Sequence, residues 1–131
     1  MSIQVQISVG EFLDKLTILQ IKSERITVPA KLENIKKELQ ILLETWQRSP
    51  YTGIDITAEM QELRVKNESL WDIEDKIRKQ EAKKIFDDTF IQLARSVYFT
   101  NDQRALVKKK LNLKLGSGLI EEKLYTEYSS E

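Results

Sequence analysis

The side chains that most often carry out covalent or acid–base chemistry are missing from this chain. Its 131 residues include no histidine and no cysteine. This excludes Ser-His-Asp and Cys-His catalytic groups, thiolate nucleophiles, disulfides and the usual zinc sites. We therefore expect no metal site and no cofactor, and the sequence leans away from an enzyme without deciding the point.

One flank of a predicted helix nevertheless collects side chains that could hold a ligand. Asn67, Trp71, Glu74 and Arg78 lie at i, i+4, i+7 and i+11, beside the apolar stripe of that helix. Polar groups near a core must be hydrogen-bonded, so a structural network is one interpretation, with Glu74 paired to Arg78 and Asn67 bonded to a neighbouring helix. The alternative is a groove for a polar ligand or a partner peptide.

A basic segment near the end of the chain is the second candidate. Six basic residues and one acidic residue lie between residues 95 and 115. A phosphate site would need Arg78, Arg95 and Lys108 together beside an aromatic ring, yet a straight helix separates Arg95 from Lys108 by roughly 20 Å. A solvated face is the other interpretation of these charges. The full set of ligand or partner groove candidates is Asn67, Trp71, Glu74, Arg78, Arg95, Tyr98, Asp102 and Lys108.

Four amphipathic segments are predicted to be the helices that position these residues. Apolar residues recur at three- and four-residue spacing over about residues 9–26, 29–48, 57–82 and 88–115. Only a short turn separates the first two, which predicts an antiparallel αα-hairpin. We expect one all-α domain over residues 1–131, with an antiparallel four-helix bundle-like arrangement.

Capping residues set the predicted helix ends. Ser8 and Glu11 match a capping box, and Asp87 is a further N-cap residue. A second capping box begins at Thr100, so the last long helix is predicted to be kinked or split there. Gly116 suits a helix C-terminus, and residues 116–131 follow as a tail.

The first helix has two apolar faces, one of which carries Asp14, Ile18, Ile21 and Arg25. Either this helix lies at the centre of the bundle, or that face is an interface with a second copy. Residues 1–7 form a short extended arm with alternating polarity, which either lies on a helix or pairs with a second copy. The unpaired arm and the second apolar face together predict a homodimer.

The overall charge and the apolar pattern limit the partners and the location that we expect for the protein. Lys+Arg and Asp+Glu both number 21, so the net charge is zero and nucleic acid is not an expected partner. No apolar run reaches the length of a membrane span, and the first residues lack the pattern of a secretory signal. We expect a cytoplasmic location.

Several blocks of the sequence are those of a known family. They are Ser8–Lys22, Leu70–Arg78, Leu93–Tyr98, Asn101–Asp102, Gly116–Ser117 and Glu121–Lys123. In these blocks the chain resembles a bacterial family of short helical proteins of unknown function, encoded near genes for lipopolysaccharide and other surface-polysaccharide assembly. Only the loop 50–56 departs from the pattern.

The resemblance implies a function in that assembly. The first candidate is a non-catalytic accessory or interaction protein, homodimeric, with a protein partner in polysaccharide biosynthesis. The alternative is a binder or transferase-like enzyme for a phosphorylated sugar or nucleotide.

Overall fold

Four α-helices make up the fold, and residues 1–128, which the computed structural model describes, contain no strand. The helices are α1 (Val9–Arg25), α2 (Pro29–Gln47), α3 (Thr57–Ala82) and α4 (Asp88–Leu115). The all-α prediction is therefore confirmed. None of these helices is long and apolar enough to cross a membrane.

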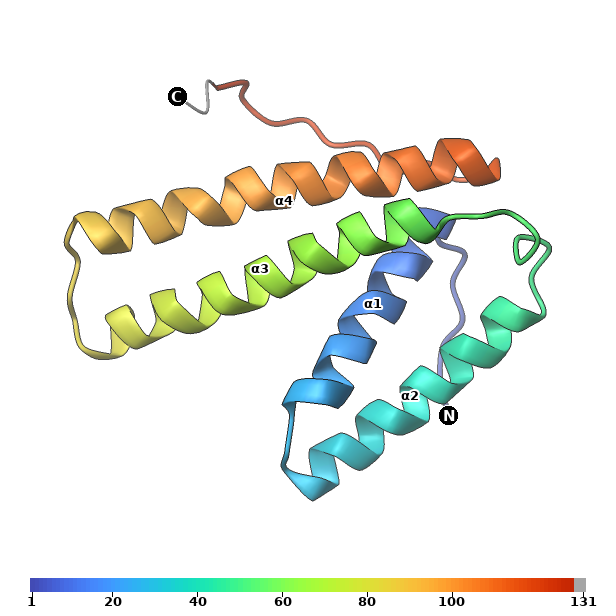
Figure 1. Cartoon of the computed structure of the whole chain (residues 1–131), viewed down its shortest axis with the longest axis horizontal. Coiled ribbons are helices and arrows are strands. Elements are labelled where there is room, and N and C mark those ends of the chain that lie inside the picture. Colours follow the sequence, from blue (N-terminus) through green and yellow to red (C-terminus); the bar gives the residue numbers. More distant parts are fainter. Residues whose placement is uncertain (129–131) are drawn as a thin grey trace.

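The helices form two antiparallel hairpins that cross at one end (Figure 1). The α1–α2 hairpin predicted from its short turn is present, and α3 pairs with α4 along its length. Helix α1 contacts all three other helices, whereas α2 contacts only α1. The two apolar faces of α1 are thus both used inside the chain, with α2 on one side and the α3–α4 hairpin on the other.

Three predicted helix ends are confirmed. The Ser8 side chain accepts a 3.1 Å hydrogen bond from the Glu11 amide, and Asp87 accepts one of 3.0 Å from the Phe90 amide. Gly116 follows α4 with φ of 65°, the left-handed conformation that glycine adopts without strain. Glu11 does not complete the capping box, because its carboxylate contacts Lys108 instead.

The prediction that the last helix is split near Thr100 is wrong. Helix α4 runs without interruption from Asp88 to Leu115. Inside a continuous helix the amides of residues 100–103 bond to carbonyls four positions earlier, so a capping side chain has no free donors to satisfy. Because α3 packs beside α4, tertiary packing favours the uninterrupted helix at this point.

The buried core lies where the two hairpins cross. Its buried apolar cluster contains Leu13, Leu16, Leu63, Val107, Leu111 and Leu115. No residue between positions 68 and 106 is buried. The far half of the α3–α4 hairpin therefore projects from the core as a pair of helices without a third layer (Figure 1).

Helix α1 begins against the end of α4, and two backbone amides there are satisfied from far along the chain. The Val9 amide donates to Ser117 Oγ at 3.1 Å, and the Gly10 amide donates to Asn112 Oδ1 at 2.6 Å. A Cβ atom on Gly10 would lie 2.4 Å from the Lys108 carbonyl oxygen. The two helices are in contact here because position 10 has no side chain.

The N-terminal arm is extended, as predicted. Ile3 and Val5 stay 92% and 74% exposed. Val5 and Ile7 line a shallow cavity together with Trp46 and Tyr51, near the end of α2. The arm therefore lies beside its own chain, although much of its apolar surface remains in contact with solvent.

Candidate functional site

A buried polar network joins α1, α3 and α4 at the crossing of the hairpins. Asp14 and Asn67 are 4% and 5% exposed. The Asn67 amide nitrogen donates a 2.9 Å hydrogen bond to Asp14, and its oxygen accepts one of 3.2 Å from Arg104. The predicted bond from Asn67 to a neighbouring helix is thus present, and it orients Asn67 in the interior.

Lys108 closes the other side of this network. Its ammonium lies 2.5 Å from Glu11, 3.3 Å from Glu121 and 3.8 Å from Asp14. Burial lowers the pKa of Lys108, but the hydrogen bond that its ammonium donates to Glu11 and the negative charges of Asp14 and Glu11 outweigh burial, so the net shift of the pKa is upward. Carboxylates from α1 and from the tail surround the Lys108 ammonium, and its side chain is buried. Lys108 is therefore neither solvated nor available to a phosphate.

A groove opens beside the network, and we call it the α1–α3 groove. It has a volume of about 360 Å³, within the range of small-molecule sites. Its lining residues are Ile18, Ile21, Asn67, Leu70, Trp71, Glu74, Asp75, Arg78 and Arg104. The flank of α3 singled out from its spacing therefore does line a groove.

Most charges around this groove are paired along one turn of α3. Glu74 accepts a 3.2 Å hydrogen bond from Arg78, and Asp75 lies 3.0 Å from Lys79. The predicted pairing of Glu74 with Arg78 is therefore present, but the pair is not buried, because the Arg78 side chain is 81% exposed. The pair lies in solvent because the hairpin has already projected beyond the core at this level.

The other groove candidates lie elsewhere on α4. Arg95 stacks over Phe99 at 5.3 Å. Tyr98 packs edge-on against Tyr128, and Asp102 accepts a hydrogen bond from the Tyr128 hydroxyl. The continuous helix keeps Arg95 far from Lys108, so the cluster that a phosphate site required is not formed.

The four interface candidates on α1 make contacts inside the chain. Asp14 and Ile21 are buried, and Ile18 lines the α1–α3 groove. Arg25 lies 2.6 Å from Asp72 and over the Trp71 ring at 5.7 Å. Intramolecular packing therefore accounts for this face of α1.

A family model matches nearly the whole chain, over residues 3–130, and its description is Family of unknown function (DUF6165). The chain belongs to this family. The DUF6165 chain matches no curated protein and no solved structure. The resemblance to a family of unknown function is confirmed to that extent.

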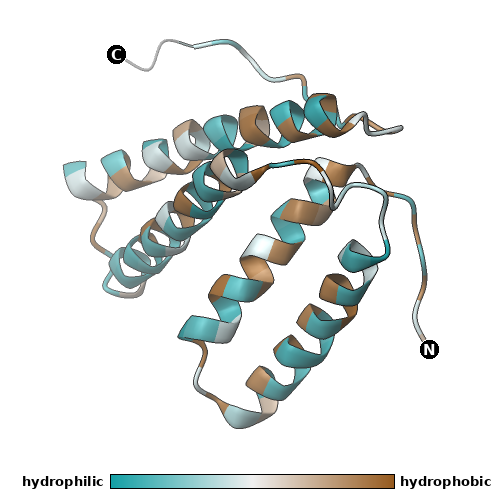
Figure 2. Cartoon of the chain, turned by 45° about the vertical axis from the view of Figure 1, so that its right-hand side comes forward, coloured by the Kyte–Doolittle hydropathy of each residue, from teal (hydrophilic) through white to brown (hydrophobic). Residues whose placement is uncertain are grey.

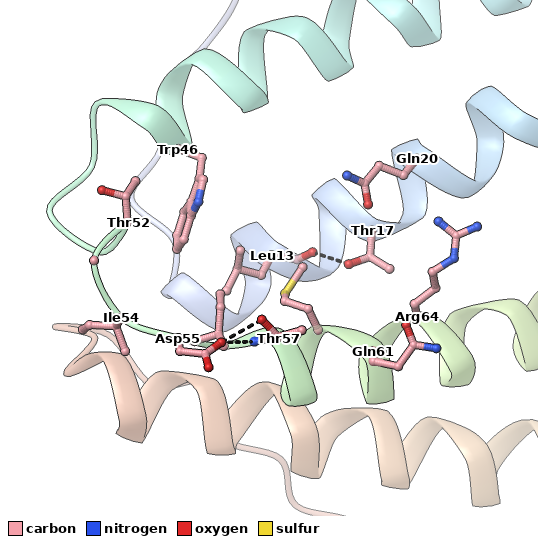
Figure 3. Close-up of a pocket in the computed structure, with 13 residues that line it drawn as sticks. Leu13, Thr17, Gln20, Trp46, Thr52, Ile54, Asp55, Thr57, Gln61 and Arg64 are labelled. Carbon is pink, nitrogen blue, oxygen red and sulfur yellow. Dashed lines mark hydrogen bonds between the residues drawn. The ribbon is translucent and has the colours of Figure 1, made fainter.

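A second cavity in this DUF6165 protein was not foreseen from its sequence. The loop pocket, as we call it, has a volume of about 680 Å³ and lies between α1, the end of α2, the loop 52–56 and the start of α3. Figure 3 shows Trp46 at one end of this space and Gln20 and Arg64 at the other. The pocket exists because α2 does not pack against α3, which spacing within single helices does not reveal.

Arg104 is the functional candidate that sequence reasoning missed. It precedes the buried residues Lys108 and Leu111 by four and seven positions, so helical periodicity alone would have placed it on the inner face of α4. Within residues 1–128 no cluster of three potential metal ligands occurs.

Proposed function

We propose that this DUF6165 protein is a non-catalytic interaction protein that works as a homodimer. The observation that carries the proposal is an apolar stripe on α4, which we call the α4 stripe. Its residues and their exposed fractions are Ile91 (50%), Tyr98 (45%), Leu106 (67%) and Leu113 (63%). At 100° per residue the four positions fall within an arc of about 80°, on the side of α4 away from its buried residues. Figure 2 shows hydrophobic segments recurring along α4.

The spacing of the α4 stripe favours a second copy of the chain as its occupant. The intervals between successive members are 7, 8 and 7 residues, the same in either direction. An antiparallel pairing about a two-fold axis near Asp102 would set Ile91 against the partner's Leu113 and Tyr98 against the partner's Leu106. Such a self-complementary patch is what an isologous dimer requires.

Three charged residues, Arg95, Asp102 and Lys109, lie within the same arc of α4 as the stripe, and the axis sets Asp102 against its own copy. The same axis brings Arg95 of one copy near the partner's Lys109. Lys109 lies 3.6 Å from Glu122 in its own chain, which offsets the repulsion between the two bases. The tail also lies at this place, because Tyr128 packs against Tyr98 and donates a hydrogen bond to Asp102. In the dimer, Tyr128 would therefore be part of the interface or be displaced from it.

Light scattering at tens of micromolar tests the dimer. We expect the wild type to have the mass of two chains and Ile91→Asp to have the mass of one. The matched control is Ile41→Asp on α2, which changes an isoleucine of similar exposure (55%) and should leave the dimer intact. A monomeric wild type, or equal dissociation by both variants, would contradict the proposal.

Cross-linking tests the position of the axis, because the natural chain has no cysteine. In an antiparallel pairing, a residue lies next to the same residue of the partner only at the two-fold axis. A disulfide needs the two Cα atoms to be about 5.5–6 Å apart. We expect Asp102→Cys to form a disulfide-linked dimer rapidly and Lys37→Cys on α2 not to do so. Equal cross-linking of the two variants would remove the α4 stripe as the interface.

We further propose that the dimer serves bacterial surface-polysaccharide assembly through a protein partner. This part is supported by the sequence blocks named above, such as Ser8–Lys22 and Leu70–Arg78. Affinity purification from the native cell should recover enzymes of polysaccharide synthesis with the wild type. Recovery of none of these enzymes, under conditions that retain the dimer, would count against it.

A further inference from the structure

Arg104 is the one groove charge that no carboxylate balances within the described chain. Glu74 and Asp75 are each paired with a base one turn further along α3, and Arg78 is the partner of Glu74. Across residues 1–128, Arg104 has no carboxylate oxygen within 4.0 Å. Its hydrogen bond goes to the neutral amide oxygen of Asn67. The groove lining contains two acidic and two basic side chains, and Arg104 is the one of these four that has no charged partner in the described chain.

The interior of the protein holds Arg104 in place. Its partner Asn67 is 5% exposed and is itself fixed by the buried Asp14 carboxylate. A guanidinium has five N–H donors, and the bond to Asn67 engages one of them. The remaining donors form a pre-oriented group suited to a carboxylate or phosphate oxygen.

The rest of the groove wall near Arg104 is mostly apolar. Ile18 and Ile21 come from α1, and Leu70 and Trp71 come from α3. An occupant that matched these groups would place a hydrocarbon body against the apolar side chains and an anionic group against Arg104. We infer that the α1–α3 groove binds an amphiphilic anion, an alkyl or aryl chain with a single carboxylate or phosphate head group.

This inference is independent of the homodimer. The α4 stripe lies on the other side of α4 from Arg104, so loss of one activity does not entail loss of the other. The stripe is tested by the mass of the protein, and the groove is tested by binding. The two measurements can be made on the same samples.

Calorimetric titration with decanoate and with decyl phosphate tests the head group. We expect the wild type to bind one or both anions below their micelle-forming concentrations and to bind decyltrimethylammonium more weakly. Arg104→Gln should weaken anion binding by about tenfold or more, whereas Arg104→Lys should retain part of it. The matched control is Arg48→Gln on α2, an arginine with a 79% exposed side chain, which should leave binding unchanged. Comparing the two anions separates a carboxylate ligand from a phosphate ligand.

Tryptophan fluorescence locates the occupant, because the two tryptophans lie in different cavities. Trp71 lines the α1–α3 groove, and Trp46 lines the loop pocket. Bromine-labelled decanoate should quench Trp71 in a Trp46→Phe background and leave Trp46 unquenched in a Trp71→Phe background. Circular dichroism on each variant confirms that the helices persist.

Three results would overturn the inference. The first is that neither anion binds at millimolar concentration. The second is that folded Arg104→Gln binds the anions as tightly as the wild type. The third is that decyltrimethylammonium binds the wild type as tightly as the anions do. Quenching of Trp46 in place of Trp71 would move the site to the loop pocket and would also overturn it.

Discussion

The side-chain amide of Asn67 donates a 2.9 Å hydrogen bond to the carboxylate of Asp14, joining two buried residues 53 positions apart. Burying a carboxylate costs free energy unless hydrogen bonds and opposite charge compensate for the lost water. Asp14 has both, since the Lys108 ammonium lies 3.8 Å from its other oxygen. The Asp14 carboxylate therefore links α1 to both α3 and α4 inside the protein.

Asn67→Leu should destabilise the protein, because it leaves the Asp14 oxygen without its donor and Arg104 without its acceptor. We expect a loss in the free energy of unfolding on the order of 1–3 kcal/mol, measured by urea denaturation. Asn34→Leu on the exposed surface of α2 is the matched control and should change stability by less than about 0.5 kcal/mol. Similar losses in the two variants would show that the bond to Asp14 contributes little.

Gly10→Ala should be destabilising even though alanine favours helices. The new Cβ atom would lie 2.4 Å from the Lys108 carbonyl oxygen, so α1 and α4 would have to move apart. Overpacking of this kind typically costs about 1–3 kcal/mol, more than the helix propensity of alanine returns. Gly53→Ala is the control, because nothing lies within 4 Å of a Cβ atom there. A thermal melt that ranks Gly10→Ala at or above the wild type would contradict the close approach.

Glu74→Ala should leave stability almost unchanged. A buried pair would lose on the order of 3 kcal/mol when one partner is removed, whereas an exposed pair loses less than about 1 kcal/mol. The Glu74 and Arg78 side chains are 46% and 81% exposed, so we expect the smaller effect in chemical denaturation. A large loss would mean that this flank of α3 is covered in solution.

The contact between the tail and α4 should depend on pH. The hydrogen bond to Asp102, together with burial and the negative charge of Asp102, raises the pKa of Tyr128 to about 12. The neutral phenol is the form that binds Asp102, so the contact is fully present below the ordinary tyrosine pKa near 10 and is lost as the pH rises through about 12. Subtracting the tyrosinate absorbance titration of Tyr128→Phe from that of the wild type should isolate this late step. A difference curve centred near pH 10 would show that Tyr128 does not contact Asp102.

Local signals in the sequence predict the helices and most of their ends. Ser8 and Asp87 accept hydrogen bonds from amides three residues later, and Gly116 directly follows α4. Their roles therefore depend only on residues that are close in the sequence. The capping box at Thr100 failed for the converse reason, since α3 packs along α4 and favours the uninterrupted helix. The groove flank on α3 was found because its members share one helix and one periodicity.

The rest of the candidate site depends on contacts between distant segments. Lys108 stands among three consecutive lysines, which is typical of a solvated face. It is buried because the start of α1 packs against α4 at this point. There the Lys108 ammonium contacts Glu11, which lies 97 positions earlier in the chain. The loop pocket and the unpaired charge of Arg104 likewise arise from how the hairpins cross, and helical spacing alone does not specify that crossing.

The hydrogen bonds between the first amides of α1 and the end of α4 can form only after most of the chain has been synthesised. The amide groups of Val9 and Gly10 find their acceptors on Ser117 and Asn112, 108 and 102 positions later. On the ribosome the first helix emerges long before either acceptor has been synthesised, and loop closure over such a span is slow. The start of α1 is therefore completed only late in synthesis, and a nascent chain that ends before Asn112 exposes the Gly10 surface to chaperones or to another chain.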